Sequence, residues 1–277
     1  AAPRKRTRWP DDIDVIFVYE ACDGADDEDA VNAATRLAAA TMRLCHEHTG
    51  EGTIWEVDAN LRPEGSAGPL VRSLASHVAY YERWATTWEF QALLKARFAA
   101  GDEALGQAYL DSLSPMIWAA STRENFVTDV RAMRRRVIEN IPTQRRDREL
   151  KLGSGGLRDV EFAVQLLQLV HGRADLSLRS PTTLVALRAL TKGGYVGRRD
   201  GAAMEEAYEF LRTLEHRIQL YRLKRSHSVP DDSEDLRRIG RSMGFRHNPV
   251  ESLTTEWQAH RRLARRLHEK LFYQPLL

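Results

Sequence analysis

Apolar and polar residues follow different patterns in the two parts of the chain. Residues 13–19 are rich in β-branched and aromatic side chains and form a run too short for a helix, which predicts a strand. Residues 29–48 are rich in alanine and stop at Gly50, which predicts a helix. Residues 53–61 alternate apolar with polar side chains, which predicts a second strand, and we expect a short third strand at residues 70–71.

From residue 73 onward the pattern favours helices throughout. Ser121 to Glu124 fits a capping box that opens a helix towards Asn140, and Ser180–Pro181 places proline at the first position of another helix. Four further helices are expected at residues 157–171, 201–224, 233–243 and 250–273. We therefore expect an α+β protein with a small β-containing domain over residues 1–115 and an all-helical bundle domain over residues 116–277.

Composition narrows the class of protein. The 277 residues include 41 Lys and Arg against 39 Asp and Glu, and this net charge of +2 argues against a nucleic-acid-binding protein. The hydrophobic share of 43% is that of a folded chain rather than a disordered one. Cys22 and Cys45 do not make a disulfide framework, which favours a reducing compartment, and no apolar run approaches the roughly 20 residues of a membrane span. We expect a cytoplasmic protein that binds neither membrane nor nucleic acid.

A group of carboxylates marks the first candidate site. Asp12 and Asp14 stand two residues apart at the start of the first predicted strand, so both lie on one face of the sheet. Asp58 lies in the second predicted strand, where burial of Val57 would send Glu56 and Asp58 to the opposite face. Such oxygen donors suit Mg²⁺, and two of these ions could clamp the attacking and leaving oxygens of a nucleotidyl transfer. The competing interpretation is a surface strand that ends in aspartates.

The turn that follows Asp58, residues 62–68, has the composition of a ligand-binding loop. Gly65 allows the backbone to approach a ligand closely, Ser66 lies beside it, and Arg62 could fork onto a phosphate. An ordinary connection between strands fits the same composition. Lys95 could direct a positive charge towards the acidic site, a question that the sequence leaves open.

A glycine-rich run at residues 151–162 leads into a predicted helix and could hold an anion. A helix that begins after Gly155–Gly156 would present backbone amides, and Lys151 and Arg158 would add positive charge. Arg158 and Glu161 also begin a polar stripe on this otherwise apolar helix, which suggests that one side of a buried helix faces a cleft. A capped helix without a ligand is the competing interpretation.

Three further patterns favour a structural role. His46 and His48 lack the spacing of four residues that would place both on one helix face as zinc ligands. The arginines within residues 131–136 are typical of a solvated helix face. Trp84 and Trp88 stand four residues apart, which predicts that they pack together in the core.

Four blocks of the sequence resemble the bacterial glutamine synthetase adenylyltransferase/adenylyl-removing enzymes. These blocks are residues 12–17, 56–71, 88–97 and 151–162. In that family two similar halves, each a nucleotidyltransferase domain with a helical bundle, share one polypeptide. One half attaches AMP to a tyrosine of glutamine synthetase, and the other removes it by phosphorolysis with release of ADP. The Lys-Leu-Gly-Ser-Gly-Gly run at residues 151–156 is similar to the adenylyl-removing, N-terminal half.

The resemblance implies a fold, a reaction and a set of site residues. It implies a small nucleotidyltransferase-type mixed sheet with helices, followed by a helical bundle, and a Mg²⁺-dependent phosphorolytic site. Asp12, Asp14 and Asp58 would carry catalysis and hold the metal. The residues expected to bind nucleotide or phosphate are Arg62, Gly65, Ser66, Lys95, Lys151, Gly155, Gly156, Arg158 and Glu161. ATP or ADP and inorganic phosphate would be substrates or products, glutamine synthetase the partner, and a PII-type nitrogen-signalling protein a partner of the full enzyme.

Residues 1–11 depart from the family pattern, which has a glycine-rich, serine-containing stretch directly before the aspartate pair. In this superfamily that stretch normally helps to hold the nucleotide phosphates, so we expect the chain to be part of one half of a larger enzyme. Two alternatives stay open. One is AMP transfer from ATP to glutamine synthetase, and the other is a catalytically silent module whose helical domain docks glutamine synthetase or a nitrogen-signalling protein.

Overall fold

The computed structural model describes residues 13–47, 50, 56–222 and 226–274. The chain divides into two compact units, residues 1–120 and residues 121–277. Each unit has its own buried core.

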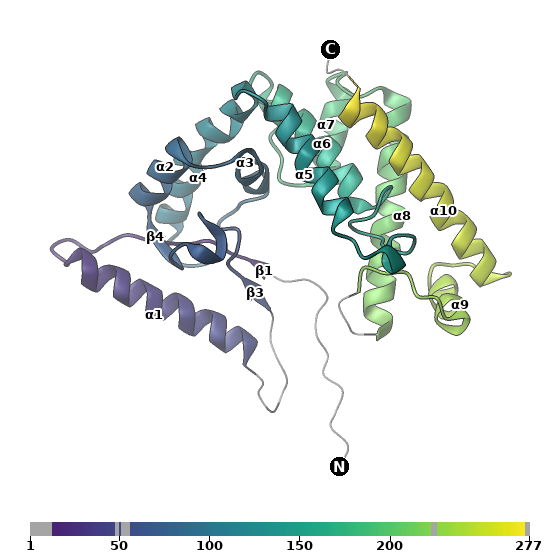
Figure 1. The fold of residues 1–277 in the computed structure, drawn as a ribbon, viewed down its shortest axis with the longest axis horizontal. Helices are drawn as coiled ribbons and strands as arrows, with labels where there is room; N and C mark the ends of the chain where they lie inside the picture. The colour runs from purple at the N-terminus through teal and green to yellow at the C-terminus, as the bar shows by residue number, and fades with distance from the viewer. Residues whose placement is uncertain (1–12, 48–49, 51–55, 223–225, 275–277) are drawn as a thin grey trace. The chain divides into compact units, whose positions relative to one another are not determined.

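Four short strands form two parallel pairs in the first unit (Figure 1). Strand β1 (Ile13–Asp14) pairs with β3 (Val57–Asp58), and β2 (Phe17–Tyr19) pairs with β4 (Val71–Ser73). The strand predicted over residues 13–19 is thus interrupted at residues 15–16, and the third strand lies one residue later than predicted. Both pairings are parallel in the described part of the chain, so the implied mixed sheet is wrong for these residues.

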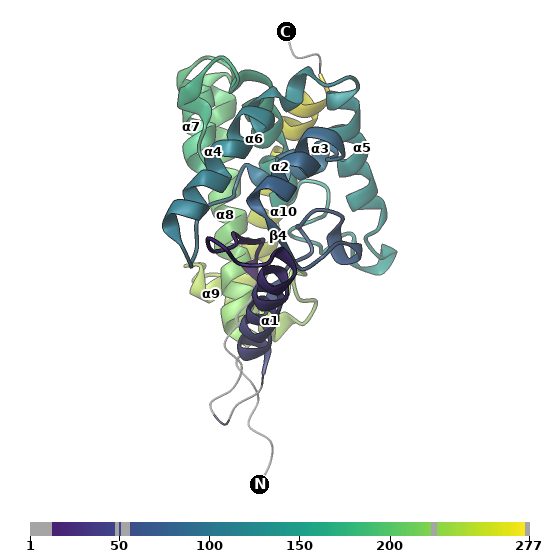
Figure 2. The same ribbon diagram turned by 90° about the vertical axis from the view of Figure 1, so that its left-hand side faces the viewer.

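Helices cover these strands on two sides. The four helices of this unit are α1 (Asp27–His46), α2 (Leu74–Arg83), α3 (Thr87–Leu93) and α4 (Glu103–Ala119). Figures 1 and 2 show α1 on one side of the strands and α2 and α4 on the other. Helix α1 begins where the Asp26 carboxylate accepts hydrogen bonds from the amides of Glu28 and Asp29.

The core of the first unit lies between the strands and α2–α4. Val71, Tyr81, Phe90 and Leu113 are buried there, whereas Val57 is buried on the side of β3 that faces α1. The prediction that Trp84 packs in the core is wrong, because Trp84 is 72% exposed. It is the residue directly after α2, where the helix ends and the chain turns towards α3.

The second unit is helical, with α6 at its centre. Its helices are α5 (Phe126–Glu139), α6 (Leu157–His171), α7 (Thr183–Lys192), α8 (Arg198–Arg222), α9 (Ser233–Ser242) and α10 (Pro249–His268), which continues as a π-helical turn (Glu269–Tyr273). Helix α6 packs against α5, α7, α8 and α10, and its residues 157 and 159–169 are all buried. This enclosure on several sides explains why most of residues 157–169 are apolar.

Three predicted helix starts are wrong in this unit, and one of them is that of α8, which begins at Arg198 rather than at Gly201. Helix α5 begins after Asn125 rather than at the predicted capping box, because residues 120–122 form a 3₁₀ turn. Helix α7 begins after Thr182, two residues beyond the predicted start at Pro181. Among the described residues, no helix is both long enough and apolar enough to cross a membrane.

Candidate functional site

Two of the predicted metal ligands lie side by side on neighbouring strands. Asp14 on β1 is the register partner of Asp58 on β3. The ladder is fixed by the amides of Ile13 and Val15, which donate to the carbonyls of Glu56 and Asp58 at 2.8 Å each. Register partners in a parallel pair carry their side chains on the same face of the sheet. The ladder therefore brings two carboxylates together, whereas Asp12 lies outside the described residues.

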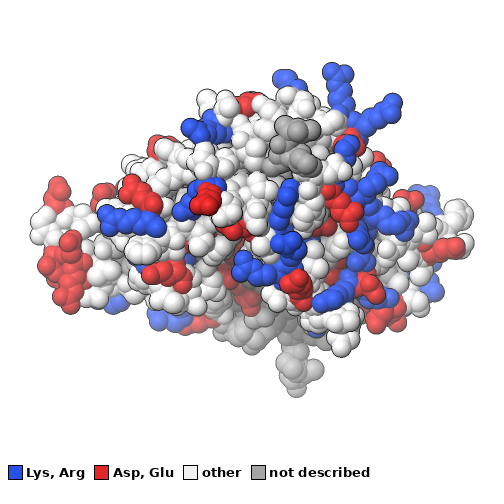
Figure 3. Space-filling model, turned by 45° about the horizontal axis from the view of Figure 1, so that its top comes forward, with Lys and Arg blue, Asp and Glu red and all other residues white. Residues whose placement is uncertain are grey.

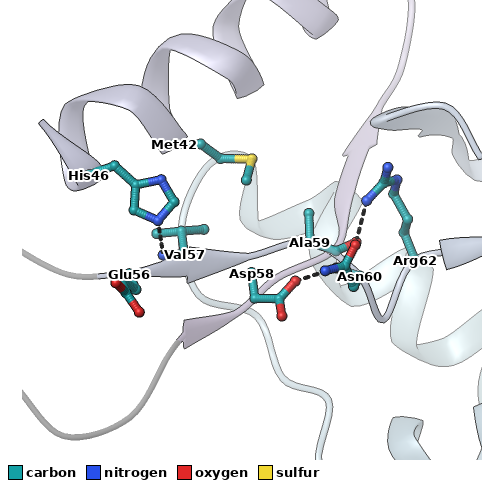
Figure 4. A pocket seen from close by; sticks show the side chains of 8 residues that line it. All are labelled: Met42, His46, Glu56, Val57, Asp58, Ala59, Asn60 and Arg62. Atoms are coloured by element: carbon teal, nitrogen blue, oxygen red, sulfur yellow. Dashed lines mark hydrogen bonds between the residues drawn. The ribbon is translucent and has the colours of Figure 1, made fainter. Parts of the chain in front are cut away.

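The orientation of β3 agrees with the pattern of its sequence. Val57 is buried at 7% exposure, and Glu56 and Asp58 point to the side of β3 away from α1 (Figure 4). The Asp58 carboxylate is held by the backbone amide of Asn60, which donates a hydrogen bond to Oδ1 at 2.7 Å. The prediction that Val57 faces the core and its neighbours face the opposite side is confirmed.

The two carboxylates are oxygen donors of the kind that Mg²⁺ takes, and the described residues contain no group of three or more His, Cys, Asp or Glu that could hold a metal ion. Asp14 is exposed and Asp58 is half-buried, so water and a ligand's phosphate oxygens can reach both. Carboxylate oxygens are ligands that Mg²⁺ prefers, and this ion usually keeps several waters and takes few protein ligands. A hollow of about 300 Å³ adjoins Asp58 and is lined by residues of α1, β3 and the following turn (Figure 4).

The turn after β3 is organised by Arg62. Its Nη1 donates to the Ala59 carbonyl at 2.8 Å, and its Nε and Nη2 donate to the Gly68 carbonyl at 3.2 and 3.1 Å. The predicted fork onto a phosphate is therefore directed at the backbone of the turn itself. Gly65 has a φ of +59°, and the neighbouring Ser66 is exposed in a 3₁₀ turn. Arg62 shapes the loop that leaves the carboxylate site.

Lys95 lies just beyond α3 in the first unit and is exposed. Its amide donates to the Ala92 carbonyl at 3.3 Å, which fixes the backbone at the end of this helix. Lys95 thus lies in the same unit as Asp14 and Asp58, and its positive charge is accessible on the surface of this unit.

The glycine-rich turn before α6 uses its amides within the chain. The Gly155 amide donates to Asp159 Oδ2 at 2.6 Å, and the Gly156 amide donates to the Gly153 carbonyl at 2.9 Å. The next two amides, of residues 157 and 158, donate to the carbonyls of residues 150 and 151. The expectation that this helix start presents open amides to an anion is therefore not met, because a folded-back loop and a carboxylate already accept from them.

Arg158 and Glu161 belong to a buried ion-pair network. Glu161 is 2% exposed and accepts from Arg158 at 2.8 Å and from Arg212 at 2.7 Å. Arg212 also pairs with the fully buried Glu215 at 2.7 Å. Burial alone would raise the pKa of Glu215, but hydrogen bonds from His227 and Arg212, with a nearby charge on Lys151, hold that pKa at about 2. The polar stripe therefore joins α6 to α8 inside the unit rather than facing a cleft.

Arg134 is an interior residue, and the prediction that it lies on a solvated helix face is wrong. It is fully buried, and its Nε donates to Asp159 Oδ1 at 2.8 Å. Its Nη1 and Nη2 donate to the Leu152 and Gly153 carbonyls at 3.0 and 3.2 Å. Arg134 follows Phe126 by eight residues and Val130 by four. This spacing is the sequence signal that places it on the buried face of α5.

Residues 9–112 match the family model described as glutamate-ammonia ligase adenylyltransferase, and residues 131–272, just over half of the chain, match the model described as GlnD PII-uridylyltransferase. Relatives named bifunctional glutamine synthetase adenylyltransferase/adenylyl-removing enzyme come from Streptomyces avermitilis and Streptomyces coelicolor, at 67% and 66% identity over 96% of this chain. A relative of the same name from Mycolicibacterium smegmatis is 56% identical over 99% of it.

The chain belongs to this enzyme family. The resemblance drawn from residues 12–17, 56–71, 88–97 and 151–162 is thereby confirmed, as is the class of nucleotidyltransferase. The chain spans about 27% of the length of these relatives. These relatives are named as bifunctional enzymes.

Proposed function

We propose that the Asp14–Asp58 site removes AMP from adenylylated glutamine synthetase by phosphorolysis. The observation that carries this proposal is the register of β1 and β3, which sets two carboxylates side by side on one face. The site lies in the part of the chain that matches the glutamate-ammonia ligase adenylyltransferase model. The run at residues 151–156 supports the adenylyl-removing direction, because it is similar to the half of the family that releases ADP.

The proposed reaction transfers one adenylyl group. An oxygen of inorganic phosphate attacks the phosphorus of adenylyl-tyrosine, the bond to the tyrosine oxygen breaks, and the proton of the phosphate passes to that oxygen. The products are ADP and unmodified tyrosine. Catalysis of such a transfer rests on positioning and charge neutralisation rather than on covalent chemistry by the protein.

The residues of the first unit have separate parts in this scheme. Asp14 and Asp58 would hold Mg²⁺, together with Asp12 as the family resemblance implies, and the bound ion would neutralise phosphate charge. The Asn60 amide keeps Asp58 oriented, and Arg62 keeps the following turn closed. Lys95 is our proposed phosphate-binding cation, with Gly65 and Ser66 on the turn beside the hollow. The reaction would take place in the cytoplasm, with a PII-type protein as a proposed regulator of the longer enzyme.

Replacement of the paired carboxylates tests the proposal. Asp14→Asn and Asp58→Asn each remove one anionic metal ligand, so we expect phosphate-dependent ADP release from adenylylated glutamine synthetase to fall at least about a hundredfold. Asp23→Asn changes an exposed aspartate of the same unit and should leave the rate unchanged. ADP release that survives both site substitutions would contradict the assignment. A chain that instead consumes ATP to modify the unadenylylated enzyme would show that the site runs in the adding direction.

A further inference from the structure

The edge of β3 that faces away from β1 is covered by side chains rather than by another strand in the described part of the chain. On the inner edge, the carbonyls of Glu56 and Asp58 accept the amides of β1. Backbone groups alternate along a strand, so the amide of Val57 and the carbonyl of Ala59 are directed to the outer edge. A strand edge with open backbone groups is easily displaced or paired wrongly.

Two side chains complete this outer edge, one on each side of Asp58. The Val57 amide donates to Nε2 of His46 at 3.2 Å, and the Ala59 carbonyl accepts from Nη1 of Arg62 at 2.8 Å. Both bonds are visible in Figure 4, with His46 reaching β3 from the last turn of α1. Asp58 therefore stands between two anchored residues, Val57 in β3 and Ala59 directly after this strand.

The chemistry of the His46 contact distinguishes it from an ordinary histidine at a helix end. A histidine at a helix C-terminus is usually favoured as a cation, because the carbonyl end of the helix is negative. Here a backbone N–H points at Nε2, so this nitrogen is the acceptor of the bond. His46 thus acts as an acceptor, and it ties the end of α1 to the strand that carries Asp58.

We propose that His46 is a positioning residue for the metal site. By holding the Val57 amide, it keeps β3 in register with β1 and Asp58 beside Asp14, without touching the metal or the substrate. This role rests on the proposed function, because it concerns the placement of a carboxylate that the proposal makes a metal ligand. Residues that orient a metal ligand in this way commonly change metal affinity by about ten- to a hundredfold when they are lost.

Three variants of the full chain test this role. His46→Leu removes the acceptor, whereas His46→Gln retains an acceptor in Oε1 at a similar reach. His216→Leu removes an exposed histidine from α8 in the other unit and serves as the matched control. The measurements are the dissociation constant for Mn²⁺ alone, followed by electron paramagnetic resonance, and hydrogen exchange of the Val57 amide, with far-ultraviolet circular dichroism as the check on folding.

We expect His46→Leu to weaken Mn²⁺ binding about tenfold and to speed exchange at Val57. His46→Gln should restore most of both properties, and His216→Leu should match the wild type. If Asp58→Asn weakens Mn²⁺ binding while His46→Leu leaves it within about twofold of the wild type, the positioning role is overturned and the proposed function stands. If the wild-type chain binds no Mn²⁺, or binds it equally well with Asp58→Asn, the metal site fails and the role of His46 fails with it.

Discussion

Arg134 and Asp159 form the most deeply buried ion pair among the described residues, at 0% and 1% exposure of their side chains. Their charges are also hydrogen-bonded to the backbone of the loop at residues 152–155. A buried pair of this kind contributes little when it replaces a well-packed apolar pair, but removal of one partner leaves an uncompensated charge in the interior. The pair therefore holds the loop before α6 in place, and removal of one partner is expected to destabilise this unit strongly.

Arg134→Met is expected to lower the free energy of unfolding of the helical unit by about 3–5 kcal/mol. The double substitution Arg134→Met/Asp159→Leu should lose less, because no charge is then left buried, although the Gly155 amide loses its acceptor and the Leu152 and Gly153 carbonyls lose their donors. Urea unfolding followed by circular dichroism measures both variants. A single variant as stable as the wild type would show that Asp159 finds another partner or lies in water.

Two buried histidines predict how stability depends on pH. Burial lowers the pKa of His77 in the first unit and of His268 in the second to about 4 each. An unfolded histidine titrates near pH 6.5, so between pH 6.5 and 4 the unfolded chain binds more protons than the folded one. The free energy of unfolding should therefore fall as the pH is lowered through this window. Below pH 4 these two histidines should add little further pH dependence.

Unfolding by urea at several pH values measures this dependence, with His77→Phe and His268→Phe as variants without the titrating ring. Each variant should show a shallower decline of stability between pH 6.5 and 4 in the unit that carries it. A decline as steep as that of the wild type in both variants would locate the pH dependence in other groups.

At the scale of the elements, the start of α6 depends on Gly155. This residue has a φ of +76°, and a Cβ added there would lie 2.2 Å from the Arg261 carbonyl oxygen on α10. A side chain would thus meet both a disfavoured backbone conformation and a fixed backbone atom. The glycine allows the loop before α6 to lie directly against α10, where Arg261 Nε donates to the Ser154 carbonyl at 2.9 Å.

Gly24 offers a matched control for this close approach. It has a similar φ of +77°, but nothing lies within 4 Å of an added Cβ. Gly24→Ala should therefore lose only the conformational term of about 1 kcal/mol, whereas Gly155→Ala should lose at least about 2 kcal/mol more. Thermal unfolding of the two variants provides the comparison. Equal losses would mean that the contact with Arg261 relaxes without penalty.

The pattern of apolar residues predicted most of the helices because each buries a continuous stripe. Helix α6 was expected at residues 157–171 and α9 after Asp232, and both occur there. The start of α5 was missed because the signal at Ser121–Glu124 is local, whereas the 3₁₀ turn at residues 120–122 decides where the helix begins. Local capping patterns cannot report such a turn.

The candidate site was predictable in part, for a related reason. Alternation along β3 correctly placed Glu56 and Asp58 on one face, and the register with β1 then joined Asp58 to Asp14. The roles of Arg62 and Arg158 were not predictable, since an arginine that binds carbonyls or a buried carboxylate has the same sequence signal as one that awaits a phosphate. Only the folded structure shows which acceptors each guanidinium binds.

At the scale of the whole molecule, the two units carry different kinds of polar chemistry. The first places accessible carboxylates on short parallel strands, and the second encloses the carboxylates of Asp159 and Glu161, each paired with an arginine, between its helices. On the face shown in Figure 3, Lys and Arg are interspersed with Asp and Glu, in keeping with the net charge of +2. The proposed chemistry therefore rests on the first unit.

The fate of radiolabelled inorganic phosphate tests the central claim most directly. The chain is incubated with adenylylated bacterial glutamine synthetase, Mg²⁺ and the labelled phosphate, and the nucleotides released are separated. Phosphorolysis at the Asp14–Asp58 site predicts that the label appears in the β-phosphate of ADP and that Asp58→Asn abolishes this transfer. Release of unlabelled AMP, or label in ADP that persists in Asp58→Asn, would contradict the account.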